Sequence, residues 1–190
     1  SPQVLLIDGS LLPLPADKPA NSSSLLPMYA EVLSLYNELF EQCAKSNCQL
    51  VGIVKDSKSQ KLCNLLEEKL QTRVSISSDE LLSNFLLAKS QRTMSFPLNE
   101  RNLQCFYLKA GNSLPYRVEF IAQNEPEKIA SQLAALLCAI SSPHFAYPSV
   151  LIEVDMRAAL TPSEVSALFT SIENRATDFV LRSNSRPFRW

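Results

Sequence analysis

The chain has 190 residues, enough for one domain with a substantial core, and 46% of them are apolar while 19% are charged. A formal net charge of -1 excludes a generally basic surface, so any electrostatic binding of nucleic acid must come from a local basic patch or from a partner. Five cysteines and the single histidine, His144, argue against a zinc site and a Ser-His-Asp triad. We expect reduced thiols and a cytoplasmic protein, and no apolar stretch approaches the roughly 20 residues of a membrane span.

The first ten residues contain the apolar run 4–7, which ends abruptly at Asp8-Gly9-Ser10. Four aliphatic residues before a polar turn predict a buried strand at the centre of a sheet, with a carboxylate at its carboxyl end. Ligands gather beyond such strand ends, so Asp8 is well placed for chemistry. The alternative is a simple turn in which the aspartate bonds its own backbone. The chain begins without methionine just before this strand, so we expect a single domain over residues 1–190 that lacks an N-terminal segment.

The next two segments differ sharply in pattern. Prolines and serines dominate residues 11–27 and predict a long loop beside the end of the first strand. Helical spacing of apolar residues over 28–45 then predicts an amphipathic helix. Glu38 lies on the carboxylate-rich flank of this helix, where a surface glutamate is the simplest interpretation.

A second apolar run predicts another buried strand over 50–54. A polar stretch that includes Asp56 follows it, and a helical pattern resumes over 60–70. Strand, polar turn and helix form the βα unit typical of α/β folds, so Asp56 stands at a strand end as Asp8 does. The alternative role for Asp56 is a cap on the following helix.

A β-hairpin is predicted where aromatic and alternating residues over 105–109 and 116–120 flank a turn. In its second strand Arg117 and Glu119 share one face, which is ordinarily the solvated face of a hairpin. Lys109 ends the first strand, where a solvated edge charge is the ordinary role.

Other segments complete the predicted elements. A short strand is predicted over 74–76 and a capped helix over 77–87. The clearest helix covers 125–140, because proline fits its first turn and apolar residues form one stripe. The pattern over 150–160 is ambiguous, starting like a strand and ending like a helix. A last helix is predicted over 161–176.

The candidate chemistry is acidic. Three scattered glycines exclude a glycine-rich phosphate loop, which leaves Asp8 and Asp56 at two strand ends. Carboxylates gathered at one edge of a sheet suit Mg²⁺ or Mn²⁺, and two such ions can activate water and stabilise both oxygens in phosphodiester cleavage.

Several short motifs follow one another along the chain. They are Ile7-Asp8-Gly9-Ser10, Gly52-Ile53-Val54-Lys55-Asp56-Ser57-Lys58-Ser59, Asp79 before Leu81-Leu82, Arg92-Thr93, Phe106-Tyr107-Leu108-Lys109, Pro115-Tyr116-Arg117-Val118-Glu119-Phe120 and Tyr147-Pro148. No single motif is diagnostic, but the ordered set resembles the NurA nuclease family from near the first residue to about residue 160.

The resemblance implies an α/β fold with an RNase H-like mixed sheet flanked by helices. It also implies a nuclease that depends on Mn²⁺ or Mg²⁺ and acts on single- and double-stranded DNA during end resection in double-strand break repair. The expected partners are a second copy of the chain and a HerA-type hexameric ATPase, with no membrane association.

The resemblance also assigns candidate metal ligands. Asp8 matches the first-strand metal aspartate of the family, and Asp56 matches its second acidic position. Glu38 corresponds to a helix glutamate of the family. At the position of the family's active-site histidine this chain has Asp155, which could ligate metal but could not do the proton work of a neutral imidazole.

Two further residues are implied to act on the phosphate. Lys109 falls where a basic residue could contact the scissile phosphate. Tyr147 matches the tyrosine that precedes the family's histidine by eight residues, although a packing role is ordinary for a tyrosine before proline. Because the histidine is replaced by Asp155, the alternative function is a catalytically reduced interaction module that dimerises or docks on a HerA-type translocase.

Overall fold

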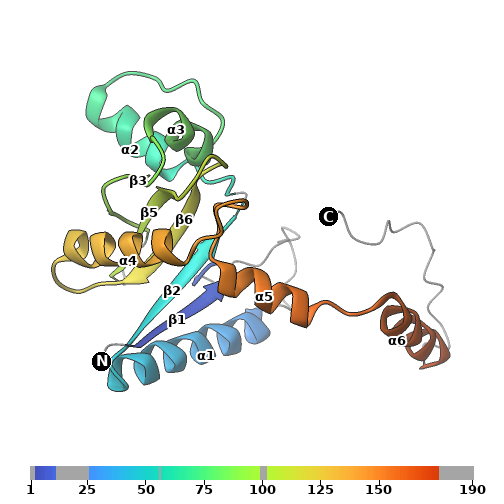
Figure 1. Ribbon diagram of the computed structural model, residues 1–190. Helices are drawn as coiled ribbons and strands as arrows, with labels where there is room; N and C mark the ends of the chain where they lie inside the picture. The colour runs from blue at the N-terminus through green and yellow to red at the C-terminus, as the bar shows by residue number, and fades with distance from the viewer. Residues whose placement is uncertain (1–2, 12–25, 56, 99–101, 176–190) are drawn as a thin grey trace. The chain divides into compact units, whose positions relative to one another are not determined.

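The computed structural model describes residues 3–11, 26–55, 57–98 and 102–175 (Figure 1). The chain divides into two compact units, Ser1–Ile152 and Glu153–Trp190. The first unit contains the described sheet. The expectation of a single domain over residues 1–190 stays a prediction.

Strands form one mixed sheet in the described part of the chain. They span Gln3–Asp8 (β1), Cys48–Val54 (β2), Gln91–Arg92 (β3), Phe96–Pro97 (β4), Leu103–Lys109 (β5) and Tyr116–Ile121 (β6). Across the sheet the order is β1, β2, β6, β5 and β3, and β4 also pairs with β5. β1 and β2 are parallel, whereas the other pairs are antiparallel. The two predicted apolar strands and the predicted hairpin are confirmed.

Helices account for most of the described residues outside the sheet. They are α1 (Leu26–Lys45), α2 (Lys61–Leu70), α3 (Asp79–Leu86), α4 (Pro126–Ile140), α5 (Ser149–Ala158) and α6 (Pro162–Arg175). The segment of ambiguous pattern is therefore a helix, α5. In the described residues no helix has both the length and the apolar character needed to cross a bilayer.

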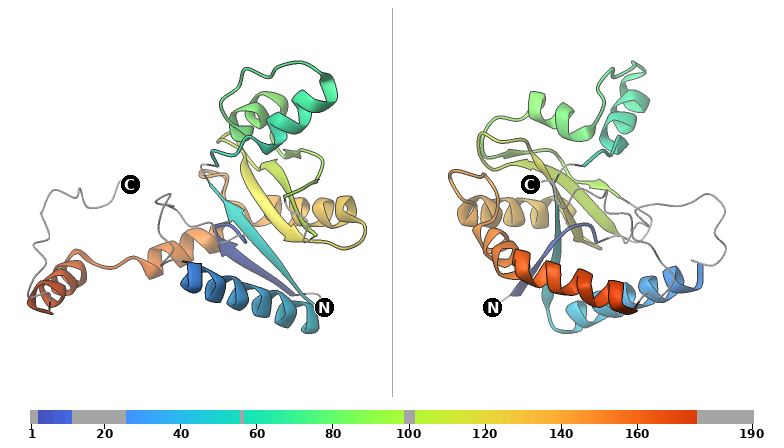
Figure 2. Two further views of the ribbon diagram at one scale, coloured as in Figure 1. Left: turned by 180° about the vertical axis from the view of Figure 1, so that it is seen from behind. Right: turned by 90° about the vertical axis from the view of Figure 1, so that its right-hand side faces the viewer.

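Different helices cover the two faces of the sheet (Figures 1 and 2). On one face α4 contributes Leu133 and Leu137 to the largest core cluster. On the other face α1 contributes Cys43, and α2 packs Leu62 against a separate cluster. The α/β class, with a mixed sheet flanked by helices, is confirmed. Because both faces of the central strands are covered, side chains of either orientation are buried there.

Local signals explain α3 and the absence of the strand predicted before it. Ser78 caps α3, because its side chain accepts a hydrogen bond from the backbone N–H of Leu81. The strand predicted over 74–76 is wrong. Its first backbone N–H, that of Val74, donates to the carboxylate of Glu67 at 2.7 Å instead of pairing with a strand. Of the predicted loop before α1, residues 12–25 lie outside the described residues.

β1 lies at the edge of the described sheet, so the prediction of a central strand is wrong. Val4 and Leu5 keep 38% and 43% of their surface exposed. The apolar run 4–7 correctly predicts a strand, but it does not specify which strands pair with it. Strand order depends on contacts that are distant in sequence.

The loop after β1 crosses directly over Gly52 in β2. A Cβ atom at this position would lie 2.8 Å from the carbonyl oxygen of Gly9 and 2.9 Å from Cγ of Leu11. Because the loop would have to move, Gly52→Ala is expected to lower the free energy of unfolding by about 1–3 kcal/mol. Chemical denaturation would measure this loss, with Gln132→Ala at an exposed position of α4 as the control that changes stability little. Unchanged stability of Gly52→Ala would contradict this packing.

Candidate functional site

Asp8 ends β1, and its carboxylate meets two side chains from distant segments. Tyr147, in the loop before α5, donates its hydroxyl to Oδ1 at 2.9 Å. Lys55, the first residue after β2, places its ammonium 3.1 Å from Oδ2. We call these three residues the Asp8 cluster. It joins the ends of the two parallel strands to a loop 139 positions further along the chain.

The sheet register brings this cluster together. β1 and β2 run parallel with Asp8 opposite Ile53, so both strands end at the same edge of the sheet. The ammonium of Lys55 also lies 4.4 Å from the centre of the Tyr147 ring, a cation–π contact. The Tyr147 ring is buried and packs edge-on against Tyr116. The cluster is therefore anchored in the core, while the side chains of Asp8 and Lys55 stay 26% and 44% exposed.

An open pocket of about 500 Å³ adjoins the Asp8 cluster and includes Lys55 and Tyr147 in its lining. Phe145 and Leu114 line the same pocket and are 66% and 48% exposed. Glu80 adds a carboxylate to the lining. The pocket thus combines charged groups with an exposed aromatic ring, which suits a ligand that has both charged and flat apolar parts.

A second cavity, of about 550 Å³, lies near the first residues of β1 and β2. Val4, Asn47 and Leu133 are among the described residues that line it, and none of its lining residues is charged. It therefore offers no charged group for a hard cation or a phosphate, and the Asp8 cluster is the better candidate site.

The other predicted metal ligands, Asp56, Glu38 and Asp155, come from three separate segments of the chain. Asp56, directly after Lys55 in sequence, lies outside the described residues. Glu38 is exposed on α1. Asp155 is exposed on α5 and belongs to the second compact unit. The ligand roles of these residues stay predictions.

Lys109 lies at the same edge of the sheet as Asp8 but on the opposite face. Asp8 pairs with Ile53, and Ile53 pairs with Val118, so these side chains share one face. Lys109 alternates to the other face and donates from Nζ to the carbonyl oxygen of Asn84 in α3 at 3.2 Å. β5 is also three strands away from β1, about 14 Å at roughly 4.8 Å per strand. The cation beside Asp8 comes instead from the residue after β2, which sequence reasoning missed.

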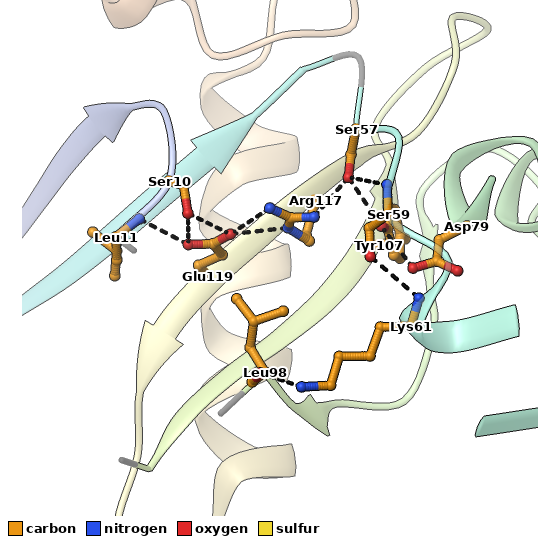
Figure 3. A network of polar contacts seen from close by, with 10 residues as sticks. All are labelled: Ser10, Leu11, Ser57, Ser59, Lys61, Asp79, Leu98, Tyr107, Arg117 and Glu119. Atoms are coloured by element: carbon orange, nitrogen blue, oxygen red, sulfur yellow. Dashed lines mark hydrogen bonds and ion pairs between the residues drawn. The ribbon is translucent and has the colours of Figure 1, made fainter. Parts of the chain in front are cut away.

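A buried polar network lies on the face of the sheet opposite the Asp8 side chain (Figure 3). Glu119 is 0% exposed and Arg117 is 8% exposed, and their side chains form an ion pair at 2.8 Å. The interpretation of these residues as a solvated hairpin face is wrong, because helices cover this face too. Burial by itself lowers the pKa of Arg117, but Glu119 and Tyr107 outweigh it and raise the pKa. The guanidinium therefore stays charged. One sequence signal could have indicated this buried ion pair. Arg117 and Glu119 carry opposite charges on one face of a strand, and the chain also contains predicted helices that could cover that face.

The network continues to the start of α3. Asp79 is 0% exposed and accepts hydrogen bonds from the backbone N–H of Cys63 at 2.9 Å and from the hydroxyl of Tyr107 at 3.3 Å. Burial raises the pKa of Tyr107 to about 12, which keeps the hydroxyl protonated as a donor. Asp79, at the start of α3, thus connects α2 and α3 to strand β5 of the sheet.

The Asp8 cluster fits a hard divalent cation in the kind of donor that it offers. Carboxylate oxygens are the ligands that Mg²⁺ and Mn²⁺ prefer, and Oδ2 of Asp8 already contacts a cation, the ammonium of Lys55. The described residues gather fewer metal-ligating side chains in one place than a divalent cation usually needs. They contain no group of three or more His, Cys, Asp or Glu side chains that could hold an ion together. Asp56, which follows Lys55 in the sequence, is the further ligand that the sequence predicts.

The fold and the site define a mixed α/β domain in which the Asp8 carboxylate and the Lys55 ammonium meet at the carboxyl ends of two parallel strands. The NurA domain family model matches residues 1–160, so the chain belongs to the NurA family. The resemblance drawn from the motifs is confirmed. This family generally comprises metal-dependent nucleases associated with DNA and HerA-type partners, which places the chain, at a coarse level, among nuclease-related hydrolases. No curated protein and no solved structure matches the chain.

Proposed function

We propose that this protein is a metal-dependent DNA nuclease in which Asp8 and Asp56 hold Mn²⁺ or Mg²⁺. The observation that carries the proposal is the Asp8 carboxylate at the shared end of two parallel strands, with the ammonium of Lys55 3.1 Å away, in a chain of the NurA family. Membership of that family also supports an RNase H-like relationship of the sheet. A divalent ion, when bound, activates water and neutralises charge on the phosphate.

The side chains of the Asp8 cluster have separate tasks in this proposal. Tyr147 fixes the orientation of Asp8 by donating to Oδ1, which leaves Oδ2 for a cation. Lys55 is 44% exposed, so its ammonium can turn from Asp8 toward a phosphate oxygen of the substrate. Lys55 then takes the phosphate-contacting role that the family resemblance assigns to Lys109.

The pocket beside the cluster supports DNA as the substrate. Phe145 presents an exposed ring there, and aromatic rings are platforms on which unpaired bases stack. A second copy of the chain and a HerA-type hexameric ATPase are the partners that we propose from family membership. Action on both single- and double-stranded ends is part of the same proposal.

Metal dependence is the direct test of the proposed function. End-labelled single-stranded and duplex DNA are incubated with the protein and Mn²⁺, Mg²⁺ or a chelator, and the products are resolved by length. We expect cleavage with Mn²⁺ and its loss on chelation, because the carboxylates have no cation to present to the phosphate without metal. Cleavage at an equal rate in chelator would contradict the proposal.

A second candidate function is an interaction module that docks on a HerA-type translocase without cutting. The ion pair between Lys55 and Asp8 favours it, because the Lys55 ammonium occupies the side of the carboxylate that a metal ion would bind. The replacement of the family histidine by Asp155 also favours the interaction module, because an aspartate cannot do the proton transfer of a neutral imidazole. Titration with Mn²⁺ separates the two candidates: specific binding lost in Asp8→Asn supports the nuclease, and the absence of binding supports the module.

A further inference from the structure

The buried Glu119 carboxylate anchors the loop that follows Asp8. Ser10 donates its hydroxyl to both carboxylate oxygens of Glu119, at 3.1 and 2.9 Å, and the backbone N–H of Leu11 donates to Oε2 at 2.8 Å. Leu11 is 0% exposed, so water does not compete for this contact. The backbone is therefore held within three residues of Asp8.

Arg117 makes the matching contact to the loop that follows β2. Its NH1 donates to the hydroxyl of Ser57 at 2.6 Å, and its Nε donates to Oε1 of Glu119 at 2.9 Å. Ser57 is 7% exposed and lies two residues after Lys55. Figure 3 shows the result, a continuous buried chain of contacts from Leu11 through Glu119 and Arg117 to Ser57.

This chain of contacts joins the two loops beyond the point where they are linked near their start. Gly9 donates its backbone N–H to the carbonyl of Ile53 at 2.8 Å, which continues the β1–β2 ladder by one residue. Beyond Gly9, the Arg117–Glu119 pair connects the loop after β1 to the loop after β2. Two guanidinium nitrogens of Arg117, Nε and NH2, contact the same carboxylate oxygen of Glu119, Oε1, and such charge-assisted contacts are stronger than neutral ones.

The pair lies on the other face of the sheet from the Asp8 side chain. Arg117 and Glu119 alternate with Val118 along β6, and Val118 shares its face with Asp8 through Ile53. The contacts of the pair with Ser10, Leu11 and Ser57 therefore connect it to the site through the two loops.

We propose that Arg117 and Glu119 are positioning residues of the site, which set the spacing between the loop after Asp8 and the loop after Lys55. The inference rests on the proposed function, because that function places Asp8 at the ion and Lys55 at the substrate phosphate, and these two residues lie at the two strand ends. Groups on two separate loops act together on one ligand only when their spacing is held in advance.

Substitutions at the ends of the pair test this without breaking the ion pair itself. Ser10→Ala and Ser57→Ala each remove one hydroxyl that the pair contacts. We expect Ser10→Ala to weaken Mn²⁺ binding about tenfold, as loss of a residue that orients metal ligands typically does, while the protein stays folded. Mn²⁺ binding is measured by electron paramagnetic resonance of the free ion, with Asp8→Asn as the reference for loss of the site. Wild-type affinity in Ser10→Ala would overturn the inference.

Amide hydrogen exchange gives a readout that needs no metal. The Leu11 amide is bonded to Glu119, so its exchange is expected to be severalfold faster in Ser57→Ala, although Ser57 is in the other loop. The matched control is Ser59→Ala, whose hydroxyl accepts from the backbone N–H of Lys61 and does not contact Arg117. If the wild-type protein fails to bind Mn²⁺, the proposed function is wrong, and this exchange still decides the link between the loops. Unchanged Leu11 exchange in Ser57→Ala would overturn it.

Discussion

Asp8→Asn is expected to slow Mn²⁺-dependent DNA cleavage by about 100-fold or more, because it removes both the charge and a hard oxygen ligand. The fold should persist. The amide oxygen can still accept the Tyr147 hydroxyl, and a partly exposed ion pair such as that with Lys55 contributes at most about 1 kcal/mol. Cleavage rates across a Mn²⁺ titration, with circular dichroism as the check on folding, measure the effect.

The control for Asp8→Asn is a carboxylate with no role in the site. Glu31 is exposed on α1, so Glu31→Gln removes one negative charge and is expected to leave the cleavage rate unchanged. If Asp8→Asn retains the full rate while the protein stays folded, the assignment of the site to the end of β1 is wrong.

Glu119→Gln is expected to lower the free energy of unfolding by about 3–5 kcal/mol, because it leaves the Arg117 guanidinium buried without its counter-charge. Arg117 is 8% exposed, so solvent cannot replace the lost partner. A loss of this size is a large fraction of the ~5–15 kcal/mol by which domains are stable. Urea denaturation followed by circular dichroism measures it.

A double variant distinguishes the effect of the unpaired Arg117 charge on stability from that of a general packing defect. Glu119→Gln keeps an acceptor for the backbone N–H of Leu11, so adding Arg117→Met removes the unpaired charge, together with its contact to Ser57, and should restore most of the lost stability. Glu125→Gln, in an exposed ion pair with Lys128, should unfold almost as wild type does. Wild-type stability of Glu119→Gln alone would mean that the pair is not buried as described.

The sequence by itself predicted the local elements well, because their signals are carried by neighbouring residues. The apolar runs 4–7 and 50–54 become β1 and β2, and helical spacing predicts α1, α2 and α4. The position of Asp8 at a strand end followed from the same patterns. The family resemblance also came from sequence alone, because ordered motifs survive without any knowledge of packing.

Only the tertiary structure decided which side chains meet. No local pattern shows that Tyr147 and Lys55 both reach Asp8, or that Lys109 is on the other face, because these depend on the register and order of strands far apart in the chain. The burial of Glu119 was misjudged for the same reason. Alternation in a strand shows which residues share a face, but whether that face is wet or covered depends on helices that pack from elsewhere in the chain.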